Sequence, residues 1–399
     1  MNDVAQDAPG RSRSIGVIVA LGTTQTVAWA SSYYLPAILA APIARDLGMT
    51  PTVIFGALSG ALVISGLLGP RVGHFIDTFG GRGLLAVSNL VFATGLLLLS
   101  FAHGPLLLGA SWLLLGIAMG MGLYEAAFAT LTRIYGSAAR SSITGITLIA
   151  GFASTVGWPI TSWLEAHYGW RVACEVWAAV HLLLAVPLNL SLPGITSAST
   201  SEASTANNGG VVQNETFAML VVAYVFAATG FVSSGLSALL PTMLVQFGAT
   251  PAAALFAGML IGPAQVTARI IEAGWLARYH PLLSARLATL TNPIGVVVLA
   301  IGGPLLAPLF AVFYGAGNGI LTIARGTLPL ALFGPKGFGR RVGMISLPAR
   351  ATGALAPLAV GFMAEVMGTG ALWVSALFSL SAFGALLLLR TSKTSADKT

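Results

Sequence analysis

Charged residues are scarce in this chain of 399 residues. They make up 8% of it, against about 25% in a typical soluble domain, while hydrophobic residues make up 56%. So little charge cannot give a globule of this size a hydrated surface, which excludes a water-soluble protein. The long alternation of polar and apolar residues that marks a membrane β-barrel is also missing. The composition therefore predicts an all-α integral membrane protein.

Cysteine is almost absent, and so are the motifs of several enzyme classes. The single Cys174 excludes an internal disulfide and a site built from several thiolates, and it is expected to be a small packing residue. No glycine-rich phosphate-binding loop is present, so ATP is not the expected energy source. An intramembrane enzyme would need a histidine–glutamate metal motif or a nucleophile beside a base, and five scattered histidines supply neither. We therefore expect no catalytic residues, no metal site and no cofactor.

The chain is basic, with a formal net charge of +7 and a pI of about 9.9. Nucleic acid is not the expected partner, because the basic residues lie at the ends of apolar runs and do not form one binding face. If the N-terminus is cytoplasmic, only Arg45 and Arg171 fall on the outer side. The residues on the inner side are Arg11, Arg13, Arg71, Arg82, Arg133, Arg140, Arg278, Arg286, Lys336, Arg340, Arg341, Arg390, Lys393 and Lys398. This asymmetry follows the positive-inside rule and predicts that both termini are cytoplasmic.

The apolar runs are long and numerous enough for twelve transmembrane helices, since a helix needs about 20 apolar residues to cross the hydrocarbon. Six are expected at 15–42, 51–72, 83–102, 105–134, 142–164 and 171–192. Six more are expected at 216–246, 252–275, 283–302, 305–333, 342–364 and 370–390. The predicted organisation is a cytoplasmic N-terminus at 1–14, a six-helix half at 15–192, a cytoplasmic linker at 193–215, a second six-helix half at 216–390 and a cytoplasmic tail at 391–399. The linker is rich in Ser, Thr, Ala and Asn and has no Lys or Arg, which is typical of a flexible connection.

The two halves share short sequence signatures. Residues 48–51 (Gly-Met-Thr-Pro) recur 200 residues later as 248–251 (Gly-Ala-Thr-Pro). At an offset of 197, Gly120, Gly122, Thr130 and Leu131 recur as Gly317, Gly319, Thr327 and Leu328. Chance is the alternative explanation in a chain with 48 glycines. As a repeat, the pattern predicts two pseudo-symmetric bundles.

A short polar segment at 69–82 (GPRVGHFIDTFGGR) separates the second expected helix from the third. Its last ten residues resemble the loop pattern G-x-L-a-D-[RK]-x-G-[RK]-[RK] of major facilitator superfamily transporters. The matching residues are Gly73, Asp77, Gly80 and Arg82, while Thr78 and Gly81 replace basic residues of the pattern. The resemblance implies a gating loop, and we expect Asp77 to meet the start of the eleventh helix around Arg340 and Arg341. An ordinary glycine-rich turn is the alternative interpretation.

The resemblance extends over the whole chain through the helix number, the central linker and the repeated halves. It implies a monomeric transporter in which two six-helix halves enclose a central cavity near the bilayer midplane and work by alternating access. In this family the first, fourth, seventh and tenth helices line the cavity. The expected location is a bacterial inner (plasma) membrane. The chain is also similar to the monocarboxylate and oxalate/formate branch, whereas Gly157-Trp158-Pro159 only approximates the Gly-Pro pattern of antiporters.

Ionisable side chains at membrane depth are costly, so they are candidate functional residues by default. The four candidates are Glu125, Arg269, Arg325 and Arg350. A polar stripe on one face of the tenth helix consists of Tyr314, Asn318, Thr322 and Arg325. This stripe predicts a substrate-binding wall, with an interhelical hydrogen-bond ladder as the alternative. Gln25 and Tyr33 offer a similar face on the first helix.

Three arginines against one deep glutamate favour a small anionic substrate, because guanidinium groups bind carboxylates well. We expect Arg325 to be the main anchor with Arg350 across the cavity, while Arg269 also fits a structural arginine that snorkels to the surface. Glu125 is expected to couple transport to protons, with a permanent ion pair to Arg325 as the alternative. The predicted function is proton-coupled transport of a small organic anion such as a monocarboxylate. The alternatives are efflux of drug-like or metalloid compounds, and a receptor that kept the fold without transporting.

Overall fold

A computed structural model describes residues 11–194 and 214–389. Most of the expected N-terminal segment, most of the expected linker and the whole expected C-terminal tail therefore lie outside the described residues. The first-half helices are α1 (Arg11–Ser31), α2 (Pro36–Asp46), α3 (Pro51–Phe79), α4 (Arg82–Ser100), α5 (Pro105–Gly122), α6 (Tyr124–Tyr135), α7 (Ala139–Ala150), α8 (Ala153–Val180) and α9 (Val186–Leu190). Those of the second half are α11 (Glu215–Gln246), α12 (Pro251–Gly274), α13 (Pro281–Gly302), α14 (Ala307–Phe333), α15 (Phe338–Met367) and α16 (Gly370–Leu387). Single turns are η1 (Gly136–Ala138), the π-helical η2 (His181–Ala185), η3 (Leu276–Arg278) and η4 (Gly303–Leu306).

Nine helical runs in the described part of the chain are long and apolar enough to cross a membrane. The run Pro105–Leu190 turns back at Gly136 and Gly169, and the run Pro281–Phe333 turns back at Gly303. All three glycines have positive φ, which other residues adopt only with strain. The two breaks divide the first run into three crossings and the single break divides the second into two. The twelve crossings that result agree with the predicted all-α membrane fold.

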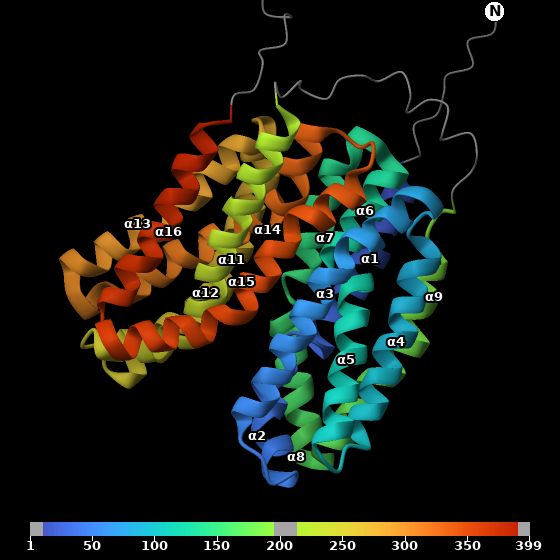
Figure 1. The fold of residues 1–399 in the computed structure, drawn as a ribbon, viewed down its shortest axis with the longest axis horizontal. Coiled ribbons are helices and arrows are strands. Elements are labelled where there is room, and N and C mark those ends of the chain that lie inside the picture. The colour runs from blue at the N-terminus through green and yellow to red at the C-terminus, as the bar shows by residue number, and fades with distance from the viewer. Residues whose placement is uncertain (1–10, 195–213, 390–399) are drawn as a thin grey trace, which may run out of the picture.

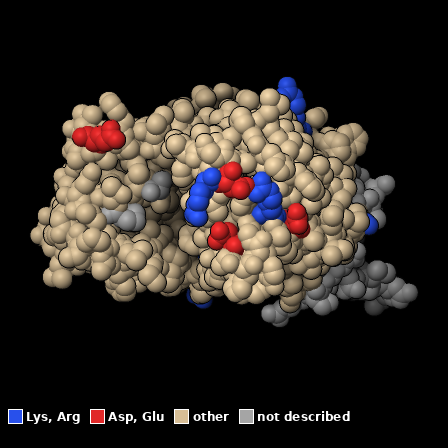
Figure 2. Space-filling model, turned by 90° about the horizontal axis from the view of Figure 1, so that it is seen from below, with Lys and Arg blue, Asp and Glu red and all other residues tan. Residues whose placement is uncertain are grey.

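The crossings form two bundles, with α1–α9 on one side and α11–α16 on the other (Figure 1). Each bundle has its own buried apolar core, and a further cluster joins Leu330, Phe338 and Val342 of the second half to the first. The bundles meet at the end that carries the turn between α3 and α4 and diverge toward the end that carries α2. Figure 2 looks onto the diverging end and shows two lobes with a groove between them. The molecule is therefore closed at one end and open at the other.

Several helix pairs join the halves, among them the antiparallel pairs α3 with α15 and α7 with α12. Along the first pair, Ser59 Oγ donates a hydrogen bond to the Ala354 carbonyl (3.2 Å), and Asp77 accepts one from the backbone N–H of Gly339 (2.8 Å). A Cβ atom on Gly73 would lie only 1.9 Å from the carbonyl oxygen of Gly339. The absence of a side chain at Gly73 is thus what permits the closest approach of the two halves.

The polar segment at 69–82 is more helical than the sequence predicted. The second expected helix was to end at 72, but α3 continues to Phe79, so Gly73 and Asp77 lie on a helix. Only Gly80 and Gly81 form the turn, and Gly80 has φ +84°. The expectation of a loop was wrong because Gly73 serves close helix packing and not chain reversal.

Three crossings of the first half are interrupted where continuous helices were expected. The first crossing breaks between Ser31 and Pro36, the fourth at Leu123, and the fifth at Gly151 and Phe152. Irregular backbone at membrane depth is tolerated where protein or a water-filled cavity surrounds it. These breaks therefore indicate where the first half forms its part of a site.

Candidate functional site

A mid-membrane ion pair links the two halves. The Glu125 carboxylate lies in the first turn of α6, directly after the break at Leu123, where the free N–H groups of a helix start favour a negative charge. Arg350 on α15 reaches it with Nη2 at 2.5 Å from Oε2, and Arg350 Nη1 donates to Ser65 on α3. The expected alternative partner of Glu125 was Arg325, but the structure uses Arg350. Arg350 is consequently engaged in an ion pair, so its hydrogen-bond donors are not free to bind an anion.

Arg325 on α14 is one of two cations of this region that have no acidic partner in the described part of the chain. Among the described residues it makes no ion pair and no hydrogen bond, and its Nε atom is buried without a partner. A Cβ atom on Gly230 would lie 3.7 Å from Nη2, which places the guanidinium against α11. Arg325 therefore holds donors ready for a ligand.

Arg269 on α12 is a second cation without an acidic partner in the described part of the chain. Its side chain does not snorkel to the surface, since the residue is only 5% exposed. Nη1 donates to the carbonyl of Thr147 on α7 (3.1 Å), and Nη2 lies 3.4 Å from Oγ1 of Thr322. Arg269 thus contacts both halves, through Thr147 of the first and Thr322 of the second, and Thr322 lies about one turn before Arg325.

The polar stripe of α14 divides into engaged and free members. The Tyr314 hydroxyl is buried and donates to the carbonyl of Ser233 (2.7 Å), as the hydrogen-bond ladder alternative expected. Thr322 donates to the carbonyl of Asn318 (2.8 Å). Asn318 Nδ2 and Arg325 Nε are buried without partners. The free members are therefore the stronger binding candidates.

The first half faces this region with aromatic rings. The Trp29 ring lies 5.3 Å from that of Tyr33, 6.1 Å from that of Tyr34 and 5.1 Å from that of Tyr124. Gln25, expected to bind substrate, is 1% exposed and donates to the Gly122 carbonyl (2.6 Å). Gln25 therefore supports the break before α6, while Tyr33 stays with the aromatic group.

At the closed end, Asp77 caps the start of α15. Oδ1 accepts from the backbone N–H of Gly339 (2.8 Å) and Oδ2 from that of Arg340 (2.9 Å). The contact was expected around Arg340 and Arg341, but it uses backbone groups and not guanidinium groups. The Arg341 side chain instead pairs with Glu215 (2.7 Å) at the start of α11. Arg82, the last residue of the motif, is exposed at the first turn of α4.

The cap that Asp77 forms on α15 is one clasp between the halves. A second clasp, which the sequence did not reveal, joins α7 to α12. Arg140 lies 3.6 Å from the Glu272 carboxylate and donates to the carbonyl of Tyr279 (2.9 Å). Glu272 lies near the end of α12, yet its side chain is only 1% exposed. The sequence repeat between the two halves could have indicated this second clasp. Each clasp joins an acidic residue on the second crossing of one half to the start of the fifth crossing of the other half.

The fold consists of two bundles with cations between them, and this arrangement has counterparts among known proteins. A family model described as Major Facilitator Superfamily matches residues 21–321. The chain belongs to the major facilitator superfamily. It is accordingly an integral membrane protein and a transporter of small solutes, as the resemblance of the gating segment implied.

Relatives of this superfamily member are distant. The chain is 27% identical over 339 residues to monocarboxylate transporter 13 of Bos taurus, a match that covers 80% of this chain and 76% of the relative. It is 25% identical over 360 residues to an uncharacterized 38 kDa protein in the 23S RNA operon of Thermoproteus tenax, covering 89% and 90%.

Solved structures share the fold of this superfamily member. The human organic anion transporter MFSD10 (TETRAN) matches with a TM-score of 0.72 at 16% identity, covering 95% of this chain and 100% of that one. The proton:xylose symporter XylE, bound to 6-bromo-6-deoxy-D-glucose, matches with a TM-score of 0.74 at 13% identity, covering 94% and 96%. At such identities the likeness concerns the fold alone.

Proposed function

We propose that this chain is a secondary transporter of a small organic anion, such as a monocarboxylate, whose carboxylate binds Arg325 with Arg269 beside it. The observation that carries the proposal is the charge imbalance at the centre. Glu125 already pairs with Arg350, which leaves Arg269 and Arg325 without counter-ions in the described part of the chain. An unpaired cation at membrane depth is costly, so an anion should be favoured there. A carboxylate matches the planar donor fork of arginine.

The relatives support this class of substrate. A monocarboxylate transporter and a human organic anion transporter are both named for anions. Their names do not specify which anion this chain takes, so the proposal rests first on its own arginines.

Proton coupling is proposed at Glu125. Its ion pair with Arg350 joins α6 of one half to α15 of the other, so protonation of the carboxylate would remove a charge–charge link between the halves. A group that holds the halves together only when ionised can tie their movement to a proton gradient. XylE, which shares the fold, is named as a proton:xylose symporter.

Efflux of drug-like compounds remains the second candidate. The aromatic group around Trp29 favours it, because flat apolar surfaces can hold planar hydrophobic molecules. It leaves the two unpaired arginines without a role, so the anion proposal explains more of the site.

The deciding experiment uses the full chain in proteoliposomes. Labelled propionate and butyrate should enter saturably and accumulate when an inward proton gradient is imposed. Drug-like cations should neither enter nor compete. Competition by cations without any carboxylate flux would overturn the anion proposal in favour of efflux.

A further inference from the structure

The aromatic group is built from three crossings of the first half. Its members Trp29, Tyr33, Tyr34 and Tyr124 are each partly exposed, and they belong to α1, to the break that follows α1, and to α6. Tyr34 extends the group to Trp158 on α8, whose ring lies 6.0 Å away and whose side chain is 42% exposed. The rings therefore form one surface that is not sealed inside the bundle.

This surface lies next to Arg325 of the second half. Phe128 stacks on Tyr124, with ring centroids 5.3 Å apart and ring planes 11° apart. Phe128 also touches α14, because a Cβ atom on Gly326 would lie 2.9 Å from its Cδ2 atom. Arg325 directly precedes Gly326, and Tyr124 lies one turn before Phe128. Since α6 and α14 are even-numbered crossings that both run toward the closed end, and helical side chains lean toward the helix start, the guanidinium and the Tyr124 ring lie at a similar depth.

Electrostatic interactions between the halves agree with this placement. The charge of Arg325 reaches the Tyr33 hydroxyl. The charge of Arg269 reaches the hydroxyls of Tyr34 and Tyr124. The two arginines and the rings therefore border the same space between the halves.

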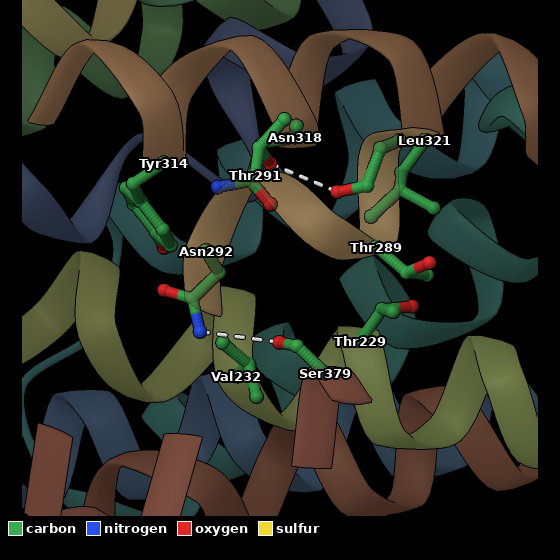
Figure 3. A pocket seen from close by; sticks show the side chains of 11 residues that line it. Thr229, Val232, Thr289, Thr291, Asn292, Tyr314, Asn318, Leu321 and Ser379 are labelled. Carbon is green, nitrogen blue, oxygen red and sulfur yellow. Dashed lines mark hydrogen bonds between the residues drawn. The ribbon is translucent and has the colours of Figure 1, made fainter. Parts of the chain in front are cut away.

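The pocket in the core of the second half is too small for a ring. It lies between α11, α13, α14 and α16, with Asn292, Tyr314 and Asn318 among its lining residues, and its volume is about 20 Å³ (Figure 3). An apolar cavity that binds benzene measures about 150 Å³. A ring attached to a carboxylate at Arg325 would therefore find its room against the aromatic group and not in this pocket.

An aryl carboxylate combines the two properties that this space favours. Its carboxylate matches the planar donor fork of arginine. Its ring can pack edge-to-face or offset-stacked on neighbouring rings, which stabilises a complex beyond the burial of apolar area. A saturated ring of the same size offers the apolar area alone. The rings of the first half thus distinguish between anions that the arginines would bind equally.

We propose that the transported anion is an aryl carboxylate, whose carboxylate binds Arg325 and whose ring packs against Trp29 and Tyr124. The inference rests on the proposed anion transport and deepens it by naming the chemical class of the rest of the substrate. It also places the aromatic group in the anion site, so the rings need no separate drug-like substrate.

The test measures the dissociation constants of butyrate, cyclohexanecarboxylate and benzoate with the purified full chain by calorimetry at neutral pH, where all three acids are ionised. The two ring acids carry one carboxylate on a ring of the same size, and only benzoate is flat and aromatic. The wild-type chain should bind benzoate roughly twofold to tenfold more tightly than cyclohexanecarboxylate, the effect of one favourable aromatic pair.

Variants of the rings locate the source of this preference. Trp29→Leu and Tyr124→Leu each remove an aromatic face, so the preference should fall close to one while butyrate binding stays within a few-fold. Tyr124→Phe keeps the face and should keep the preference, which separates lost ring contact from a general disturbance of α6. The matched control is Trp275→Leu, because Trp275 is an exposed tryptophan at the closed end.

The outcomes separate the two proposals. Equal binding of both ring acids by a wild-type chain that also binds butyrate would overturn the aryl subsite and leave the anion site standing. A wild-type preference in both leucine variants would overturn the subsite as well, and so would loss of the preference in Trp275→Leu. If none of the three acids binds, the anion proposal fails and the subsite fails with it.

Discussion

At the scale of single residues, substrate binding should depend most on Arg325. Arg325→Ala removes the free guanidinium and should weaken carboxylate binding roughly tenfold to a hundredfold, the usual effect of losing hydrogen bonds to a charged group. Arg325→Lys should give an intermediate loss, because a point charge replaces a planar fork. Binding is measured by the carboxylate-induced rise in melting temperature of purified protein. Arg45→Ala, an exposed arginine at the open end, is the control, and wild-type binding by Arg325→Ala would remove Arg325 from the site.

Glu125 should determine whether transport is driven by a proton gradient. Glu125→Gln keeps the size of the side chain but cannot titrate, so proteoliposomes should lose accumulation driven by a pH step and retain exchange of substrate across the membrane. The measurement compares the two fluxes in one preparation. Uphill accumulation by the variant would place the coupling group elsewhere and leave Glu125 as a structural partner of Arg350.

At the scale of helices, the cap that Asp77 places on α15 should set how fast the closed end opens and closes. Asp77→Asn retains an acceptor but removes the charge that favours the helix start, a loss of about 1 kcal/mol at the clasp. Turnover should fall while substrate affinity stays within a few-fold, since the site is remote. Thr78→Ala, one residue further along, is the control. Unchanged turnover in Asp77→Asn would show that the clasp does not limit the cycle.

The start of α13 should make stability depend on acidity. His280 Nδ1 accepts the N–H of Leu282 (3.2 Å). Partial desolvation, with Arg140 and Arg286 nearby, lowers the pKa of His280 below its ordinary value of 6.5, although part of the side chain is exposed. The unfolded chain therefore binds this proton more readily than the folded one. The contribution of His280 to stability is complete above about pH 6.5 and is lost as pH falls toward the lower folded pKa.

A comparison of variants isolates that contribution. His280→Asn keeps a capping acceptor but does not titrate, so its melting temperature should fall less between pH 7.5 and pH 5 than that of the wild type. His103→Asn, at an exposed loop of the other end, should follow the wild type. If the melting temperatures of His280→Asn and of the wild type fell equally with pH, His280 would not be the source of the pH dependence.

At the scale of the whole molecule, Gly73 should control which end is closed. A Cβ atom there would lie 1.9 Å from backbone of the opposite half, so Gly73→Ala should disfavour the closure seen in the structure. Spin labels at the exposed positions Thr78 and Lys336 should report a longer distance between the halves in this variant. Gly56→Ala on the same helix meets nothing within 4 Å and should leave the distance unchanged. An unaltered distance in Gly73→Ala would mean that the halves adapt around the methyl group.

The fold could be predicted from sequence because its causes are local. The number of crossings follows from apolar runs of membrane length, and helix starts follow from prolines such as Pro51, Pro105 and Pro251. The breaks at Leu123 and between Ser31 and Pro36 could not be predicted in the same way. They depend on neighbouring crossings that satisfy the freed backbone groups, as Gln25 does for Gly122.

The sequence singled out the ionisable residues at membrane depth, which remain candidate site residues, but it did not predict their partners. Glu125, Arg269, Arg325 and Arg350 stand out because a charge in an apolar run is costly wherever it points. Which arginine meets Glu125 depends on how α6 and α15 meet, and helical spacing within one crossing carries no information on that. The same limit hid Glu272, whose partner Arg140 lies on the other half.

The unmatched arginines have a consequence for how the transporter would respond to membrane voltage. Among the described residues, Glu125 neutralises one of the three central arginines, which leaves a surplus of two positive charges there when no anion is bound. Moving one elementary charge across the whole membrane changes its energy by about 2.3 kcal/mol at a potential of 100 mV. A charge that moves through part of the field contributes the corresponding fraction. The carboxylate of the proposed substrate would cancel one of these charges. The conformational change of the carrier without substrate should therefore depend on voltage more strongly than exchange, in which the carrier crosses with one anion bound in each direction.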